Sequence, residues 1–217
     1  MTQHFTTWSY SAWAQWRKCP RSAYYSRILK LPQPSSPAMD RGTAIHQLAQ
    51  DFVEGKLVDV PVELKLFYGQ FKMLHDRRAQ CEQNWGFTSS WGACGFFDPH
   101  VWLRVKCDAV YRDGANAVIV DHKTGRIYDE HHDQLELYAL AGFIMLPDAR
   151  KIIAQDWYLD QDAVTQDEFM RKEVSALKKK WNANVEPYFN DSIFPCRPSP
   201  LCKYCAFSKA NGGQCEF

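Results

Sequence analysis

Residues 101–138 read VWLRVKCDAVYRDGANAVIVDHKTGRIYDEHHDQLELY, and they predict the centre of the fold. Along Val101–Arg112 apolar and polar residues alternate, which is the pattern of a half-buried β-strand with Asp108 on its polar face. A turn at Asp113–Gly114 follows, and Ala117–Val120 is then a continuous apolar run, typical of a strand covered on both faces. The stretch therefore predicts two paired strands in the interior of a sheet.

Three charged side chains are expected to meet on one side of this hairpin. Asp121 and Lys123 end the second strand, and side chains two residues apart on a strand share a face. Together with Asp108 they would offer two carboxylates and an ammonium group. Hard divalent cations bind carboxylate oxygens and substrate phosphates, and a bound ion can activate water for hydrolysis. A lone D-x-K usually only solvates a strand end, but the buried run before it and the second carboxylate favour a metal site.

Asp108, the run VIVDHKTG at Val118–Gly125 and the run QLELY at Gln134–Tyr138 resemble the PD-(D/E)XK nuclease superfamily, specifically its RecB-like branch. That branch includes the nuclease domains of bacterial helicase-nucleases and the CRISPR-associated adaptation nucleases. The resemblance implies an α/β, restriction-endonuclease-like fold: a mixed central β-sheet flanked by helices, with an N-terminal helical region and a cysteine-rich C-terminal tail. Members usually carry Gly three residues before the first aspartate, where this chain has Val105.

The resemblance also implies a set of site residues. Mg²⁺ or Mn²⁺ would be held by Asp108, Asp121 and the backbone carbonyl of His122, with Asp108, Asp121 and Lys123 as the catalytic group. Gln134 and Tyr138, one helical turn apart, would lie near the DNA.

The N-terminal part adds two further motifs. Residues 17–25 read RKCPRSAYY, similar to the Cys-Pro-Arg-x-x-Tyr-Tyr segment of RecB-like nucleases, which implies that Arg21 and Tyr24 contact substrate. The residues alone also allow a solvated helix with an aromatic core face. Gly42, Thr43 and His46 match the Gly-Thr-x-x-His motif of the family, which implies His46 as a metal ligand, although a histidine at the border of an apolar stripe is usually structural.

The remaining pattern predicts an order of elements around this hairpin. We expect one domain over residues 1–217, with a mainly helical part at 1–80, the nuclease core at 81–190 and the cysteine-rich tail at 191–217. A parallel crossover should link the hairpin to the strand that follows it. The expected elements are helices at Ala12–Leu29 with Pro20 interrupting, Arg41–Val53, Glu63–Ala79, His131–Met145 and Asp167–Tyr188, strands at Cys81–Thr88 and Lys151–Leu159, and a loop at Leu31–Met39.

Composition sets the broad class of the protein. The chain has 217 residues, 46% hydrophobic and 24% charged, with a net charge of +1, so any affinity for nucleic acid must come from local patches. Neither a secretory leader nor an apolar run long enough to cross a membrane is expected. The eight cysteines of a chain of this kind should stay reduced or bind metal, and we expect a cytoplasmic protein.

The tail, Phe194–Phe217, reads FPCRPSPLCKYCAFSKANGGQCEF and concentrates four of the cysteines. Thiolates at such spacing bind zinc or an iron-sulfur cluster, which would hold together a tail with few apolar residues. The resemblance implies a [4Fe-4S] cluster on Cys19, Cys202, Cys205 and Cys215. The interval before Cys215 is wider than in the family, so Cys196 is a rival ligand, and Zn²⁺ on the four tail cysteines is the alternative.

These features together predict a divalent-metal-dependent deoxyribonuclease, an exonuclease acting on DNA ends or single strands. The alternative is a nucleic-acid-binding or scaffold protein on the same fold, which does not cleave and carries a structural zinc or iron-sulfur site. We expect DNA as the partner and no membrane. The sequence leaves open whether a helicase or integrase also binds.

Overall fold

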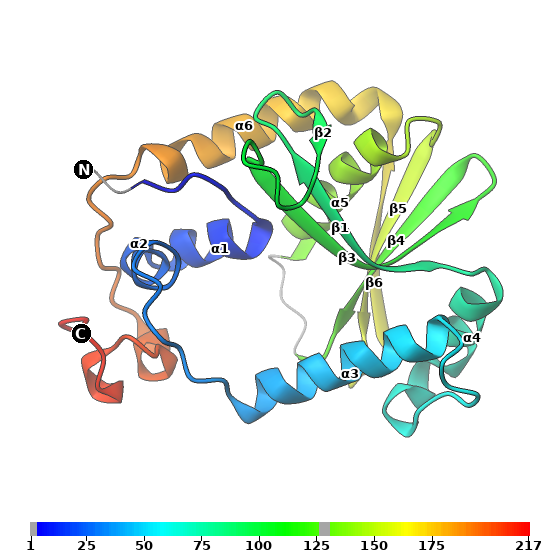
Figure 1. Ribbon diagram of the computed structural model, residues 1–217, viewed down its shortest axis with the longest axis horizontal. Coiled ribbons are helices and arrows are strands. Elements are labelled where there is room, and N and C mark those ends of the chain that lie inside the picture. The colour runs from blue at the N-terminus through cyan, green and yellow to red at the C-terminus, as the bar shows by residue number, and fades with distance from the viewer. Residues whose placement is uncertain (1–3, 126–130) are drawn as a thin grey trace. The chain divides into compact units, whose positions relative to one another are not determined.

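The computed structural model describes residues 4–125 and 131–217, and the chain divides into two compact units (Figure 1). One unit comprises residues 37–179 and contains the β-sheet. The other comprises residues 1–36 and 180–217, so it is built from both ends of the chain. The single nuclease domain expected over the whole chain stays a prediction.

The sheet of the first unit has six strands in the order β2-β1-β3-β4-β5-β6. The pairing of β4 with β5 is parallel, whereas the other four pairings are antiparallel. The mixed sheet and the parallel crossover expected from the sequence are therefore confirmed. The strands are β1 (Gln80–Phe87), β2 (Ala93–Cys94), β3 (Leu103–Asp113), β4 (Asn116–Lys123), β5 (Lys151–Tyr158) and β6 (Ala163–Met170).

Helices cover both faces of this sheet (Figure 1). On one face, α3 (Pro37–Val53), a 3₁₀ turn (Val62–Phe67) and α4 (Tyr68–Asp76) pack in a buried cluster with Val118 and Val120 of β4. On the other face lies α5 (His131–Met145), where a Cβ added at Gly142 would meet the side chains of Ile119 and Ile152. Because β4 is buried from both sides, its sequence is a continuous apolar run, as expected.

Two of the boundaries that differ from those expected are helix starts. Helix α3 begins at Pro37, inside the expected loop, because proline fits the first turn of a helix, where its missing N–H leaves no bond unmade. The long helix expected from Asp167 was wrong at its start: residues up to Met170 belong to β6, and α6 begins at Val174 and ends at Asn190. Since β6 is an edge strand with a mostly polar sequence, its alternation was masked by charged residues.

The second unit is organised around aromatic side chains. It contains α1 (Tyr10–Lys18), α2 (Pro20–Ala23), a π-helical turn (Tyr24–Ile28), the part of α6 from Lys180 onward, and 3₁₀ turns at Pro200–Tyr204 and Lys209–Asn211. The ring of Trp181 lies 5.5 Å from that of Trp8 and 5.2 Å from that of Trp13, centroid to centroid. These contacts tie segments from the two chain ends into one core.

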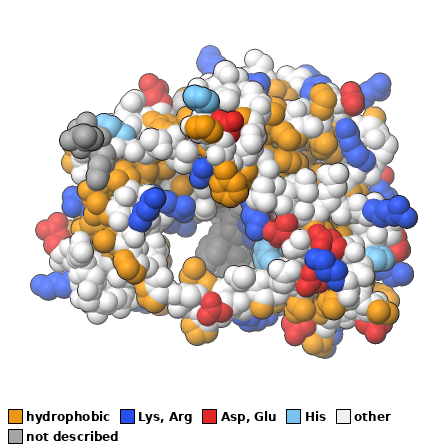
Figure 2. Space-filling model, viewed as in Figure 1, with side chains coloured by type: hydrophobic (Ala, Val, Ile, Leu, Met, Phe, Trp, Pro, Cys, Tyr) orange, Lys and Arg blue, Asp and Glu red, His pale blue; other side chains and the backbone are white. Residues whose placement is uncertain are grey.

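The surface carries mixed charge. Figure 2 shows acidic and basic side chains interspersed on the viewed face, in keeping with the net charge of +1. In the part of the chain that the structure describes, none of the helices combines the length and apolar character needed to span a bilayer.

The packing of α5 gives a prediction about two helical glycines. A Cβ added at Gly142 would lie 2.6 Å from Ile119 Cδ1 and 2.7 Å from Ile152 Cδ1, whereas one at Gly69 in α4 meets nothing within 4 Å. Alanine favours a helix over glycine by up to about 1 kcal/mol, but overpacking a core costs about 1–3 kcal/mol. Gly142→Ala should therefore lower the free energy of unfolding measured in urea, and Gly69→Ala should raise it. The same sign for both variants would contradict the described packing.

Candidate metal centre and active site

The carboxylate of Asp108 is bound from two directions. His46 of α3 lies with Nδ1 3.1 Å from Asp108 Oδ1, and the backbone N–H of His122 donates to Asp108 Oδ2 over 2.6 Å. The His122 ring is also close, with Nδ1 3.8 Å from the same Oδ2. Ligand atoms of His46, Asp108 and His122 all lie within 4.8 Å of one another. These three side chains could therefore hold a metal ion.

An irregularity in the sheet accompanies Asp108. The register of β1 with β3 pairs Cys81 with Ala109 and Gln83 with Cys107, and the pair between them is interrupted. On β1 this position is Glu82, whose φ of 52° is left-handed, a conformation that costs a residue with a Cβ roughly 1–2 kcal/mol. Strain of this kind is commonly held at functional sites, and here it lies beside the candidate metal ligand.

Asp121 belongs to a closed ring of four side chains at the end of β4. The Lys123 ammonium group lies 2.6 Å from Asp121 Oδ2 and donates to Gln134 Oε1 over 2.7 Å. Gln134 Nε2 in turn donates to the Tyr138 hydroxyl over 2.7 Å, and that hydroxyl donates to Asp121 Oδ1. Gln134 and Tyr138 of α5 thus fix the orientation of the acid and the lysine. Tyr138 is buried, and the expectation that both residues contact DNA stays a prediction.

The charges in this region are mutually compensating. Burial alone would lower the pKa of Lys123, but the carboxylates of Asp121 and Asp156 outweigh it and raise that pKa. Burial alone would raise the pKa of Asp108, but the hydrogen bond from His46 and the nearby His122 outweigh it and lower that pKa. Lys123 is therefore a cation and Asp108 an anion at neutral pH, which suits binding of a metal ion and stabilisation of negative charge.

Asp156 is a residue that the sequence analysis missed. It lies on β5 directly beside Asp121 in the parallel register, is fully buried, and has Oδ1 3.7 Å from Lys123 Nζ. Burial is the largest influence and raises the pKa of Asp156 to about 7. A single Asp in the run KIIAQDWYL carries no motif. The only sequence signal is that a buried strand rarely holds a charged residue without a partner.

The structure thus brings most of the predicted site together in two adjoining groups. One joins His46 to Asp108, and the other joins Asp121 to Lys123, Gln134 and Tyr138. The compact metal-ligand group found among the described residues contains the side chain of His122, whereas only its backbone carbonyl was expected as a ligand.

The predicted substrate contacts of the N-terminal segment lie in the other unit. Arg21 Nε donates to the carbonyl of Phe194 over 2.8 Å, and the Tyr24 ring stacks on Phe194 at a centroid distance of 4.7 Å. Both side chains therefore help to attach the C-terminal tail, and their expected contact with substrate stays a prediction.

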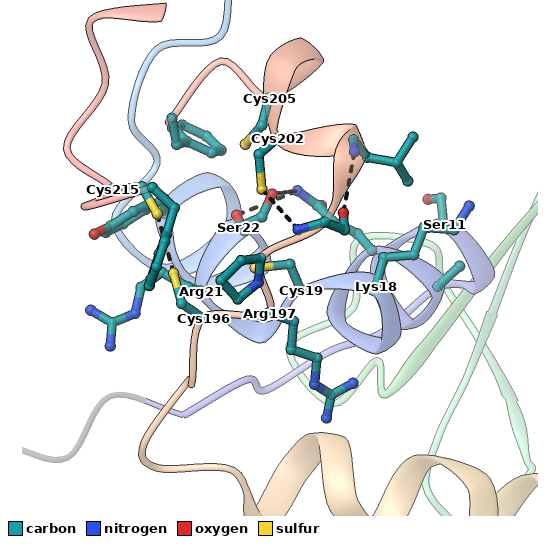
Figure 3. Close-up of a pocket in the computed structure, with 18 residues that line it drawn as sticks. Ser11, Lys18, Cys19, Arg21, Ser22, Cys196, Arg197, Cys202, Cys205 and Cys215 are labelled. Carbon is teal, nitrogen blue, oxygen red and sulfur yellow. Dashed lines mark hydrogen bonds between the residues drawn. The ribbon is translucent and has the colours of Figure 1, made fainter. Parts of the chain in front are cut away.

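Five cysteines line one cavity of about 370 Å³ in that unit (Figure 3). Cys19 stands between α1 and α2, and the other four come from the tail, with the Sγ atoms of Cys196 and Cys215 3.1 Å apart. In this respect the structure places every predicted cluster ligand, and the rival Cys196, around a single space. The cysteine lining consists of Cys19, Cys196, Cys202, Cys205 and Cys215.

Comparison with known proteins defines the class. The family model of the PD-(D/E)XK nuclease superfamily matches residues 7–210, so the chain belongs to that superfamily. No curated protein matches the sequence. Among solved structures, one titled "Crystal structure of SSO0001" is similar in fold, with a TM-score of 0.51 and 17% identity over 95% of this chain and 86% of that one. The superfamily is thereby confirmed, and membership of its RecB-like branch stays a prediction.

The buried Asp156 gives a prediction about pH. Because its pKa is raised to about 7, this carboxyl group takes up a proton more readily in the folded than in the unfolded chain, where aspartate titrates near pH 4. The free energy of unfolding contributed by Asp156 should therefore fall as pH rises from about 4 to about 7, by up to a few kcal/mol.

Asp156→Asn should remove this fall because an amide does not titrate. Urea unfolding of the wild type and the variant across this pH window tests the prediction, with the exposed Asp76→Asn as the matched control. Equal slopes for the wild type and Asp156→Asn would contradict it.

Proposed function

We propose that this member of the nuclease superfamily is a divalent-metal-dependent DNA nuclease, acting as an exonuclease on ends or single strands. The observation that carries the proposal is the ring formed by Asp121, Lys123, Gln134 and Tyr138 beside the Asp108–His46 pair. Two carboxylates and a fixed ammonium group are the components that hydrolysis of a phosphodiester needs.

The chain's own residues have separate roles in this proposal. His46, Asp108 and Asp121, with the backbone carbonyl of His122, would hold Mg²⁺ or Mn²⁺. When bound, such an ion supplies a Lewis acid that lowers the pKa of water and offsets phosphoryl charge. Lys123, kept protonated by Asp121 and Asp156, orients the attacking water and stabilises negative charge as it develops. Gln134 and Tyr138 hold this lysine and its acid in place.

A row of basic residues supports a polyanionic substrate. Arg104 and Lys106 precede Asp108 at two-residue steps on β3, so the three share a face, with successive residues about 6–7 Å apart. Lys106 is exposed, although it also pairs with Glu82. Arg104 lies over the rings of Phe96 and Phe97, at 5.6 and 5.7 Å from their centroids, and residue Phe97 is 84% exposed. A basic row with an exposed aromatic suits phosphate contact and base stacking.

The alternative is a binding or scaffold protein on the same fold that does not cleave. It does not explain the ring of side chains around Lys123. A buried lysine that only stabilised the fold would need one carboxylate partner, whereas two carboxylates surround this one. In a protein without catalysis the same geometry would lower stability, because burying charged groups costs free energy that apolar side chains in their place would avoid.

For the tail we propose a [4Fe-4S] cluster on Cys19, Cys202, Cys205 and Cys215. Tetrahedral zinc with Zn–S bonds of about 2.3 Å needs four sulfurs roughly 3.8 Å apart. Among the described cysteines no three have sulfurs within 4.8 Å of one another, and a cavity lies between them. A cluster, whose thiolate ligands bind different irons, suits this wider arrangement. Its role would be to hold the tail in place.

Nuclease activity can be tested with end-labelled linear DNA and circular DNA in Mg²⁺, Mn²⁺ or EDTA. The wild type should degrade linear DNA when either ion is present and spare DNA in EDTA. Lys123→Ala should lower the rate about 100-fold or more, because a preorganised group that stabilises charge in the transition state contributes on that scale. Circular DNA should be degraded more slowly if the enzyme starts at ends.

Lys72→Ala, an exposed lysine of α4, is the matched control and should keep wild-type activity. Full activity of Lys123→Ala would exclude the proposed mechanism. Binding of DNA without degradation by the wild type would favour the scaffold alternative.

The cluster can be tested by purifying the protein without oxygen. The wild type should be brown, with iron and sulfide in equal amounts, and Cys19→Ala should be colourless. Cys94→Ala, a cysteine outside the cavity, and Cys196→Ala should both keep the colour. A colourless wild type containing one zinc per chain would instead favour the zinc alternative.

A further inference from the structure

The side chain of His122 is buried without a hydrogen-bond partner. Only 5% of the residue is exposed, and neither Nδ1 nor Nε2 makes a hydrogen bond to any residue that the structure describes. A polar group left unsatisfied inside a protein costs about 1–3 kcal/mol, so native structures contain few of them. This imidazole therefore needs a partner that the described residues do not supply.

The surroundings of His122 hold the ring in a fixed position. It packs between Phe71 at 5.1 Å and Trp157 at 5.7 Å, measured between ring centroids. A neutral imidazole with a free lone pair is the form that binds metal ions.

Two other ligand groups face the same ring. The His46 imidazole lies 5.8 Å away, centroid to centroid, in an edge-to-face arrangement, and Asp108 Oδ2 is 3.8 Å from His122 Nδ1. The ligand atoms of all three residues lie within 4.8 Å of one another. Val118, Val120 and His122 are two residues apart on β4 and share the face that packs against α3. Asp121 lies on the opposite face, where it accepts a hydrogen bond from Tyr138 of α5.

We propose that the His122 imidazole is itself a metal ligand and that His46, Asp108 and His122 form a site for a first-row transition ion. This inference rests on the metal site of the proposed function, shares its ligands His46 and Asp108, and adds to it the His122 imidazole and the choice of ion. Mg²⁺ takes oxygen ligands almost exclusively, whereas two imidazoles and one carboxylate are a ligand set typical of first-row transition ions such as Mn²⁺ or Fe²⁺. Mn²⁺ should therefore bind in preference to Mg²⁺.

The test uses Mn²⁺, which is paramagnetic, as the probe. Pulsed electron paramagnetic resonance of the wild-type protein with one equivalent of Mn²⁺ should show coupling to the nitrogens of two imidazoles. His122→Phe should show one, and its dissociation constant for Mn²⁺ should rise tenfold or more. A hundredfold excess of Mg²⁺ should leave the wild-type signal in place. His75→Phe, a histidine of α4 outside the site, is the matched control.

A second variant, His122→Asn, covers the case in which His122→Phe does not fold, and it should also show one imidazole. A wild-type spectrum with a single imidazole, unchanged in either His122 variant, would overturn the inference. DNA degradation by the same wild-type preparation distinguishes failure of this inference from failure of the proposed function. An active enzyme with a one-imidazole spectrum refutes only the role of His122. A wild type that neither binds Mn²⁺ nor degrades DNA refutes the inference and the proposed function together.

Discussion

Charges buried between two layers of helices are the constraint on which this structure depends. Asp108, Asp121 and Asp156 lie on three adjacent strands, and each is at least nine-tenths buried. An unpaired charge in such a place costs several kcal/mol, so the fold is stable only if every carboxylate has a partner. Lys123 is the partner of Asp121 and Asp156. The His46 side chain and the His122 backbone N–H bind Asp108.

The partners come from helices on opposite faces of the sheet, which links assembly of the site to packing of the core. Helix α3 brings His46 while its apolar side packs on β4, and α5 brings Gln134 and Tyr138 while Gly142 packs on Ile119. A shift of either helix would change hydrophobic contacts and charge pairing together. Docking of both helices therefore orients the groups before any substrate binds, and such preorganisation makes electrostatic stabilisation effective.

Local pattern was enough to predict the centre of the fold, because the relevant signals lie within a few residues. The alternation before Asp108 and the apolar run of β4 are short-range patterns, and the helix carrying Gln134 precedes a local stop signal at Pro147-Asp148. Asp156 and the His122 side chain were missed for another reason. Their importance comes from register and helix packing: Asp156 matters because β5 sets it beside Asp121, and His122 because α3 delivers His46 to it. No pattern within one segment contains that information.

At the cysteine cavity, a local backbone preference helps to form a long-range contact. The residue before a proline is driven out of the helical region, and Cys19, preceding Pro20, has extended backbone angles of −157° and 104°. The same proline ends α1 and opens α2, so Cys19 lies at a break between helices and lines the cavity with the tail cysteines. Arg21, one residue beyond Pro20, then bonds to the Phe194 carbonyl. A single Cys-Pro-Arg segment thus provides both a thiol and an anchor for the tail, so a short motif at one chain end can organise a site whose other ligands lie at the opposite end.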